Sequence, residues 1–247
     1  MLDMQKALTA VTYLNPDMKE FVRRMVTVVE GSEFTNDPSD AGGATKYGVS
    51  IRYALGQGLI FDFNHDGRIT ADDIKLVTPE IAMATFVYDF FLSPGLNNLP
   101  TCMQEEAMDA SVNQGPGASI KLVQRTVNHL RRECPDLAAA VPVPLVEDGG
   151  YGGKTNTAIH QAASLLPSTK LVNTFCDLRD QAYDTIVAND PTQSRYIRGW
   201  KLRADSFRIP DAPKGKAPVD ASKRVDMAPP FKGVSATFFQ DAEAESA

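Results

Sequence analysis

Amphipathic helical segments run through most of this chain and constrain its fold more than any other feature. The first begins at Asn15, a residue type that favours helix N-caps, followed by Pro16, which suits the first helical position. Its apolar residues recur at helical spacing up to Glu30, and Gly31 can end the helix in the left-handed conformation. Similar spacing recurs at 79–92, 102–113, 118–132, 155–166, 170–188 and 194–207. We therefore predict a mainly α fold.

Strand signals are few by comparison. Residues 47–51 and 59–63 are rich in β-branched, aromatic and other apolar side chains and are short enough to be strands. We expect them to form a small hairpin or irregular β element beside the helices.

Composition narrows the class of protein. The hydrophobic content of 43% can build a core, and the net charge of −6 argues against nucleic acid or an anionic membrane as the partner. No apolar run is long enough to span a bilayer, so we expect no stable membrane insertion. We also expect the protein to be a monomer.

The cysteines and the N-terminus indicate where the chain is made. Cys102, Cys134 and Cys176 are widely spaced without a CxxC pair, which is typical of reduced thiols rather than a disulfide framework. The first residues lack a basic start followed by an apolar run, so we predict no signal peptide. We expect synthesis in a cytoplasm and release by another factor if the substrate lies outside.

The end of the first helix is the strongest candidate for catalysis. The carboxyl of Glu30 stands at the negative end of the helix dipole, which favours its protonated form, and a protonated carboxyl can serve as a general acid. Asp37 and Asp40 follow on a glycine-containing segment that can turn back, and the Thr45 hydroxyl can hold a water molecule. Glycoside hydrolysis commonly uses two such carboxylates. The same residues would equally make an ordinary capped helix followed by a turn.

The segment from Glu30 to Ser50 resembles the signature of glycoside hydrolase family 108. This family comprises lysozyme-like peptidoglycan hydrolases of phages and bacteria, with a pattern close to E-G-G-Y-x-N-D-P-x-D-x-G-G-x-T-x-x-G. Ser32 and Phe34 depart from its small and aromatic positions, whereas some ten other positions agree. Two later stretches, Tyr88-Asp89-Phe90-Phe91 and Asp109-Ala110-Ser111-Val112-Asn113-Gln114-Gly115, are also similar to the family.

The resemblance implies a lysozyme-like helical fold that cuts the β-1,4 bond between N-acetylmuramic acid and N-acetylglucosamine. It implies that Glu30 is the general acid. Related phage lysozymes use a Glu, an acidic partner and a Thr, which by spacing correspond to Glu30, Asp40 and Thr45, with Asp37 as the competing carboxylate. Three further residues are candidates for substrate binding: Tyr47, Tyr88 and Asn113.

Residues 62–73 match a twelve-residue calcium loop of the EF-hand kind. The side chains of Asp62, Asn64 and Asp66 occupy positions 1, 3 and 5, the carbonyl of Arg68 position 7, and Asp73 position 12. Aspartate at the last position reaches less far than the usual glutamate. The loop resembles those of dockerins, which carry two copies where this chain has one. We expect a structural Ca²⁺ here, the alternative being an Asx turn before a helix at Ala71.

A second module follows the first. Leu122 to Asn128 and Val146 to Ile159 are similar to the small peptidoglycan-binding domain often fused to this family, and 196–203 resembles its "G-W-x-x-R" end. Within that end, Trp200 either stacks on sugar or pins the last helix as a core aromatic. We expect a lysozyme-like catalytic region at 1–115, a helical peptidoglycan-binding region at 116–208 and a Pro-rich, largely flexible tail at 209–247.

The sequence therefore predicts a muramidase, typical of a phage endolysin, acting on bacterial peptidoglycan without a catalytic cofactor. One alternative is a zinc amidase or peptidase on the same polymer, which needs a cluster of metal ligands. The three histidines, His65, His129 and His160, stand in unrelated contexts. The other alternative is a non-catalytic wall-binding or structural virion protein that keeps the fold.

Overall fold

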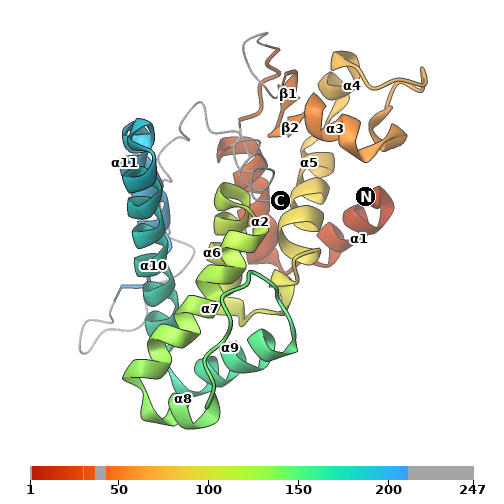
Figure 1. The fold of residues 1–247 in the computed structure, drawn as a ribbon. Helices are drawn as coiled ribbons and strands as arrows, with labels where there is room; N and C mark the ends of the chain where they lie inside the picture. Colours follow the sequence, from red (N-terminus) through yellow and green to blue (C-terminus); the bar gives the residue numbers. More distant parts are fainter. Residues whose placement is uncertain (1, 30, 37–42, 211–247) are drawn as a thin grey trace. The chain divides into compact units, whose positions relative to one another are not determined.

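The computed structural model describes residues 2–29, 31–36 and 43–210, and these are mainly helical, as the sequence predicts (Figure 1). The chain divides into two compact units, one formed by the residues up to Ser93 and the other beginning at Pro94. The domain boundary that we expect after residue 115 follows sequence motifs, whereas this division follows packing. The helix at Thr101–Gln114 lies with the second unit.

The first unit holds short helices and one small hairpin. Its elements are α1 (Met4–Tyr13), α2 (Pro16–Arg24), the π-helix η1 (Met25–Val29), β1 (Thr45–Lys46), β2 (Val49–Ser50), α3 (Ile51–Gln57), the 3₁₀ turn η2 (Leu59–Phe61), α4 (Ala71–Leu76), α5 (Pro79–Val87) and the π-helix η3 (Tyr88–Leu92). Helix α5 packs against α1 and α2, while the hairpin lies beside α3 and α4 (Figure 1).

The helix expected before Glu30 begins as predicted. The Asn15 side chain accepts a hydrogen bond from the backbone N–H of Met18 at 2.8 Å, and Pro16 takes the first helical position. Met18, Val22 and Met25 form its buried face. The last five residues, Met25–Val29, wind as a π-helix rather than an α-helix. Short π segments of this kind frequently accompany functional sites.

The strand prediction is partly wrong. The hairpin pairs Thr45 with Ser50 and Lys46 with Val49, so it begins two residues before the expected 47–51 segment. Residues 59–61 form a 3₁₀ turn because Phe61 is needed in the core, where it is buried against Tyr53. Helix α1 has no counterpart in the prediction, although Asp3 caps it and its Ala7 is buried.

The second unit is a bundle around three helices. Its elements are η4 (Leu96–Asn98), α6 (Thr101–Gln114), α7 (Pro116–Glu133), α8 (Pro135–Ala140), α9 (Gly153–Leu165), α10 (Ser168–Asn189), η5 (Pro191–Gln193) and α11 (Ser194–Asp205). Helices α6, α7 and α10 pack on one another, α8 and α9 pack on α7, and α11 lies along α10 (Figure 1). Their buried residues supply the core of this unit.

Candidate functional site

The three candidate carboxylates, Glu30, Asp37 and Asp40, lie outside the described residues, as does the expected tail from residue 211 onward. The structure describes the backbone on either side of them. Gly31 has a φ of 84°, which confirms the left-handed stop expected after Glu30. The segment that carries the two aspartates is then bounded by Asn36 and Gly43.

Thr45 helps to close the base of that segment. The backbone N–H of Thr35 donates to the carbonyl of Thr45 at 2.9 Å, and the N–H of Thr45 donates back at 2.8 Å. The hydroxyl of Thr45 donates to the carbonyl of Gly43 at 3.0 Å. Its proton is therefore committed to the backbone, while the oxygen keeps lone pairs that can accept a hydrogen bond from water.

The second glycine of the Gly-Gly pair has a steric role. Gly43 has a φ of 68°, and a Cβ built there would lie 2.8 Å from the Cγ2 atom of Ile51. Any larger residue would be strained in conformation and would also collide with the start of α3. This close approach explains why the chain needs glycine directly before Ala44 and Thr45.

Tyr47, a candidate for substrate binding, occupies the turn of the hairpin. Its φ is 51° and that of Gly48 is 76°, so both turn residues are left-handed, as two-residue hairpin turns of type I′ require. A tyrosine in this conformation is uncommon, and such outliers concentrate at functional positions. The ammonium of Lys46 lies 5.5 Å from the centre of the Tyr47 ring.

Asp89, a carboxylate that is not among the candidate site residues named above, pairs with a tyrosine. The hydroxyl of Tyr53 on α3 donates a short hydrogen bond to Asp89 in η3, one residue after the candidate Tyr88. Burial raises the pKa of Asp89, although the bond from Tyr53 opposes the rise. Burial and the carboxylate raise the pKa of Tyr53 above its ordinary value. Asp89 belongs to the Tyr88–Phe91 stretch that resembles the family, and this resemblance is the sequence feature that could have identified it as a candidate site residue.

The calcium-like loop is folded around its own oxygens. The side chain of Asp62 accepts from the N–H groups of Asp66 at 3.1 Å and Gly67 at 2.9 Å, and Asn64 accepts from Asp66 at 2.9 Å. Asp66 in turn accepts from the N–H of Arg68 at 2.9 Å. Gly67 has the left-handed φ of 83° expected for the sharp turn.

Asp73, the residue expected to complete the metal ligands, is fully buried and caps helix α4. Its carboxylate accepts from the N–H groups of Phe63 at 2.9 Å, Asn64 at 3.2 Å and Thr70 at 2.8 Å. These bonds lower the pKa of Asp73 against the opposing effect of burial. Over the described ranges, no group of three or more His, Cys, Asp or Glu side chains is placed to hold a metal ion.

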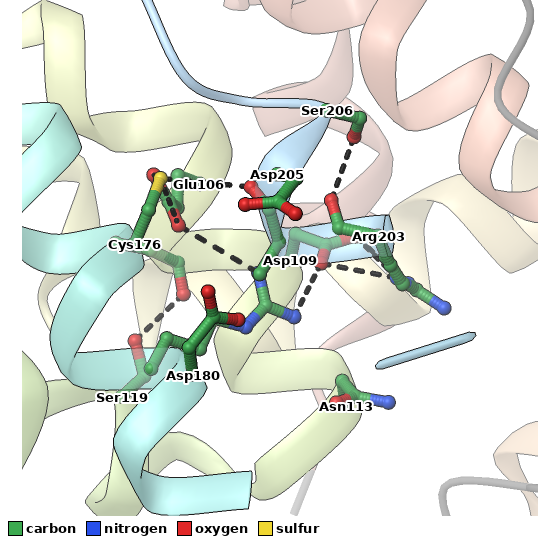
Figure 2. A network of polar contacts seen from close by, with 12 residues as sticks. Glu106, Asp109, Asn113, Ser119, Cys176, Asp180, Arg203, Asp205 and Ser206 are labelled. Atoms are coloured by element: carbon green, nitrogen blue, oxygen red, sulfur yellow. Dashed lines mark hydrogen bonds and ion pairs between the residues drawn. The ribbon is translucent and has the colours of Figure 1, made fainter. Parts of the chain in front are cut away.

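The second unit contains a buried ionic network that joins two of the sequence motifs (Figure 2). Arg179 on α10 donates to Asp109 on α6 at 2.6 Å, and Arg203 on α11 donates to the same carboxylate at 2.9 Å. Arg179 and Asp109 are fully buried. The two guanidinium groups hold the pKa of Asp109 below its usual range despite burial.

Asn113, proposed above for substrate binding, also belongs to this network. The hydroxyl of Tyr183 donates to the side-chain oxygen of Asn113 at 2.6 Å and accepts from Arg179 at 2.9 Å. Asn113 is half-buried. The contacts of its oxygen therefore join α6 to α10 within the second unit.

Glu106 lies one turn before Asp109 on α6, and its pKa is shifted in the opposite direction (Figure 2). Burial raises its pKa to about 8, partly offset by Arg179, whose Nη1 lies 3.9 Å away. The thiol of Cys176 donates to its carboxylate at 3.0 Å. Burial and the carboxylate also raise the pKa of this thiol. Sequence inspection missed Glu106 because a single glutamate on an amphipathic helix carries no sign of burial.

Trp200 belongs to the core. It is 5% exposed and stacks against Tyr183, at 5.3 Å between ring centres, and against Tyr196, at 5.7 Å. Because the side chain is almost fully buried, the ring packs α11 on α10 and leaves little surface for a sugar. The sequence left open whether Trp200 stacks on sugar or is a core aromatic, and its packing shows that it is a core aromatic.

The glutamine and asparagine of the second module's motif hold the 141–152 loop. The side-chain amide of Asn128 donates to the carbonyl of Leu145 at 2.9 Å and accepts from its N–H at 2.8 Å. Gln124 similarly donates to the carbonyl of Gly150 at 3.1 Å and accepts from the N–H of Gly149 at 3.0 Å, and it also donates to the side chain of Asp148 at 2.8 Å. Both amides thus pair with the loop as another strand would, which explains why this pattern favours Gln and Asn.

The three histidines occupy separate contexts, as their sequence positions indicate. His65 lies in the calcium-like loop with a φ of 60°. His129 contacts Glu133 at 3.0 Å on α7, and His160 on α9 contacts the carbonyl of Asn98 at 2.9 Å. None of the helices in the described part of the chain is both long and apolar enough to cross a membrane.

Two family models match successive stretches of the chain. Residues 23–115 match the family model described as "Glycosyl hydrolase 108", and residues 119–205 match the one described as "Predicted Peptidoglycan domain". No curated protein matches the chain. The solved structure of SagA from Brucella abortus is similar over 85% of this chain and 99% of that chain, with 18% identity and a TM-score of 0.44.

The first match spans the candidate carboxylates, the hairpin and the calcium-like loop, while the second spans Gln124, Asn128 and the last helix. The chain therefore carries a glycosyl hydrolase 108 domain followed by a peptidoglycan domain, and it is a glycoside hydrolase that acts on peptidoglycan.

Proposed function

We propose that the protein is a muramidase, the endolysin of a phage or prophage, that hydrolyses the β-1,4 bond between N-acetylmuramic acid and N-acetylglucosamine. The observation that carries this is the family match over 23–115, which includes Glu30, Asp37, Asp40 and Thr45. The hydrogen-bonded pair Thr35–Thr45 supports it, because it joins the two ends of the segment that holds both aspartates.

In this proposal Glu30 donates its proton to the glycosidic oxygen as the bond to the leaving sugar breaks. Asp40, or Asp37 in its place, carries the negative charge that stabilises the developing oxocarbenium ion or directs the attacking group. The Thr45 oxygen accepts a hydrogen bond from the water that completes hydrolysis. Tyr47 and Tyr88 supply ring surfaces beside the chain of sugars. Asn113 lies in the second compact unit, where its side-chain oxygen accepts from Tyr183, and is a separate candidate for a polar contact to the same polymer.

The test combines variants with product analysis on purified peptidoglycan. Replacing Glu30 with Gln should reduce the rate by about 10²- to 10⁴-fold, as expected for loss of a general acid. Asp40→Asn and Asp37→Asn, assayed side by side, identify the second carboxylate. Mass spectrometry should find new reducing sugar ends in the wild-type digest.

Three outcomes would contradict this proposal. New free amines, with no new reducing ends, mean that the enzyme is an amidase or peptidase. Lysis that is unchanged in Glu30→Gln means that Glu30 is not the acid. Lysis by neither protein, with retained wall binding, means a structural wall-binding protein.

We also propose that residues 62–73 bind Ca²⁺, which would brace the domain rather than take part in the reaction. Side-chain oxygens of Asp62, Asn64 and Asp66 recur at alternate positions around Gly67. The carbonyl of Arg68 follows at the expected place. Carboxylate and carbonyl oxygens suit a hard cation of flexible geometry. Asp73 would share its carboxylate between the cation and the amides it already accepts.

A further inference from the structure

The C-terminal end of helix α4 contacts the hairpin that carries the proposed catalytic threonine. The ammonium of Lys46 on β1 donates to the carbonyl of Lys75 at 2.5 Å. Lys75 stands in the last turn of α4, where carbonyls lack partners within the helix and carry the negative end of the helix dipole. A cation is therefore well placed at this carbonyl, and the contact ties β1 to α4.

The same turn of α4 also reaches Phe34, on the other side of the base of the aspartate-bearing segment. The ammonium of Lys75 lies 5.4 Å from the centre of the Phe34 ring and 2.8 Å from the carboxylate of Asp72. Phe34 directly precedes Thr35, the partner of Thr45. One helix end thus contacts the residues next to both members of the Thr35–Thr45 pair.

Helix α4 is itself held firmly at its start. The buried carboxylate of Asp73 accepts from the N–H of Thr70, and the Thr70 hydroxyl accepts from Asp72 at 3.3 Å, which completes a capping box. Ile74 on the next position is fully buried. A helix fixed in this way can serve as a rigid support for what its other end contacts.

Lys46 lies between two residues of the proposed site. Successive side chains of a strand point to opposite faces, so the contact of Lys46 with α4 leaves Thr45 on the other face of β1. The next residue along the chain is Tyr47, and the ammonium of Lys46 lies over its ring. The left-handed backbone conformation of Tyr47 costs free energy, so contacts with its surroundings are needed to maintain it.

We propose that Lys46 is a positioning residue, which fixes Thr45 and Tyr47 against helix α4 for the hydrolysis proposed above; the inference rests on that proposed function. Lys46 does not contact the reacting atoms in this account. It acts through the hairpin, by setting where the threonine oxygen and the tyrosine ring stand.

The test compares Lys46→Met and Lys46→Gln, which remove the charge, with Lys46→Arg, which keeps it. The control is Lys19→Met, an exposed lysine on α2 of the same unit. Initial rates on purified peptidoglycan give kcat and KM, and thermal melting gives the folded fraction. We expect kcat to fall about ten- to hundredfold in the two neutral variants, the range that a small displacement of a reacting group produces. Lys46→Arg should recover most of the loss, and Lys19→Met should match wild type.

A merely structural role would lower the melting temperature and reduce the active fraction equally in all Lys46 variants, without a fall in kcat per folded molecule. Wild-type kcat in folded Lys46→Met or Lys46→Gln overturns the inference. Glu30→Gln is assayed in the same series. An active Glu30→Gln refutes the proposed acid, whereas wild-type kcat at position 46 beside an inactive Glu30→Gln refutes only the role of Lys46.

Discussion

The guanidinium of Arg203 donates to both carboxylate oxygens of Asp109, with its Nε 2.9 Å from Oδ1 and 3.0 Å from Oδ2, although the residues stand 94 positions apart. Asp109 belongs to the stretch matched by the glycosyl hydrolase model and Arg203 to that matched by the peptidoglycan domain. The ends of the two matched stretches therefore share one buried ion network within the second compact unit.

Loss of the central carboxylate should destabilise the protein strongly. In Asp109→Asn, the fully buried Arg179 keeps only the more distant carboxyl group of Glu106, at 3.9 Å, whose raised pKa leaves it mostly uncharged at neutral pH. Breaking a buried ion pair from one side costs about 3–5 kcal/mol in free energy of unfolding. Urea denaturation of wild type and variant measures the difference. Glu133→Gln, which removes an exposed pair with Lys170, is the control and should leave the midpoint nearly unchanged.

Stability should depend on pH through Glu106. Its pKa of about 8 in the folded protein exceeds the ordinary 4.5, so the folded state holds the proton more tightly than the unfolded state. The stability that Glu106 contributes is therefore fully present below the ordinary pKa of 4.5. This contribution to the free energy of unfolding is lost as the pH rises toward about 8, by at most about 1.4 kcal/mol per pH unit. Glu106→Gln, a neutral isostere, should remove this slope in urea denaturation between about pH 5 and pH 8. Parallel curves for the two proteins would show that Glu106 does not titrate in this range.

Helix α6 should be required by the second module. A chain that begins at Pro94 keeps Asp109 and Glu106 against α10, whereas one that begins at Pro116 leaves Arg179 buried without any of its carboxylate partners. Ser119 would also lose the carbonyl of Ala107 to which its hydroxyl donates at 2.7 Å. Thermal melting is measured by circular dichroism. We expect the chain that begins at Pro94 to melt cooperatively, and the chain that begins at Pro116 to show a broad transition or to aggregate. Equal melting of the two would mean that α6 packs on this unit without stabilising it.

Calcium removal should change stability more than chemistry. If residues 62–73 bind Ca²⁺, excess chelator should lower the melting temperature, while the rate per folded molecule at a permissive temperature stays near its starting value. A double variant, Asp62→Asn with Asp66→Asn, should melt at the same temperature with chelator and with added calcium. Wild-type protein that melts identically under both conditions would contradict the proposal.

The sequence by itself determined the longer helices and, within about two residues, where they begin, whereas the short helices α1, α3 and α8 were not expected from it. Asn15 and Thr78 act as N-caps because their side chains accept a backbone N–H in the first turn, with proline following each. Such signals involve only neighbouring residues, so they can be recognised in the sequence without knowledge of the fold. The left-handed Gly31 and the turn at Gly67 are local in the same sense.

Only the tertiary structure decided what the motif residues contact. Trp200 is a core residue because Tyr183 and Tyr196 stack against it, and Asp109 carries a charge in the interior because Arg179 and Arg203 meet there. The expected 59–63 strand failed for the same reason, since burial of Phe61 outweighed local strand preference. Local patterns specify backbone conformation over a few residues, whereas burial and ion pairing depend on partners tens of positions away, which no short stretch of sequence contains.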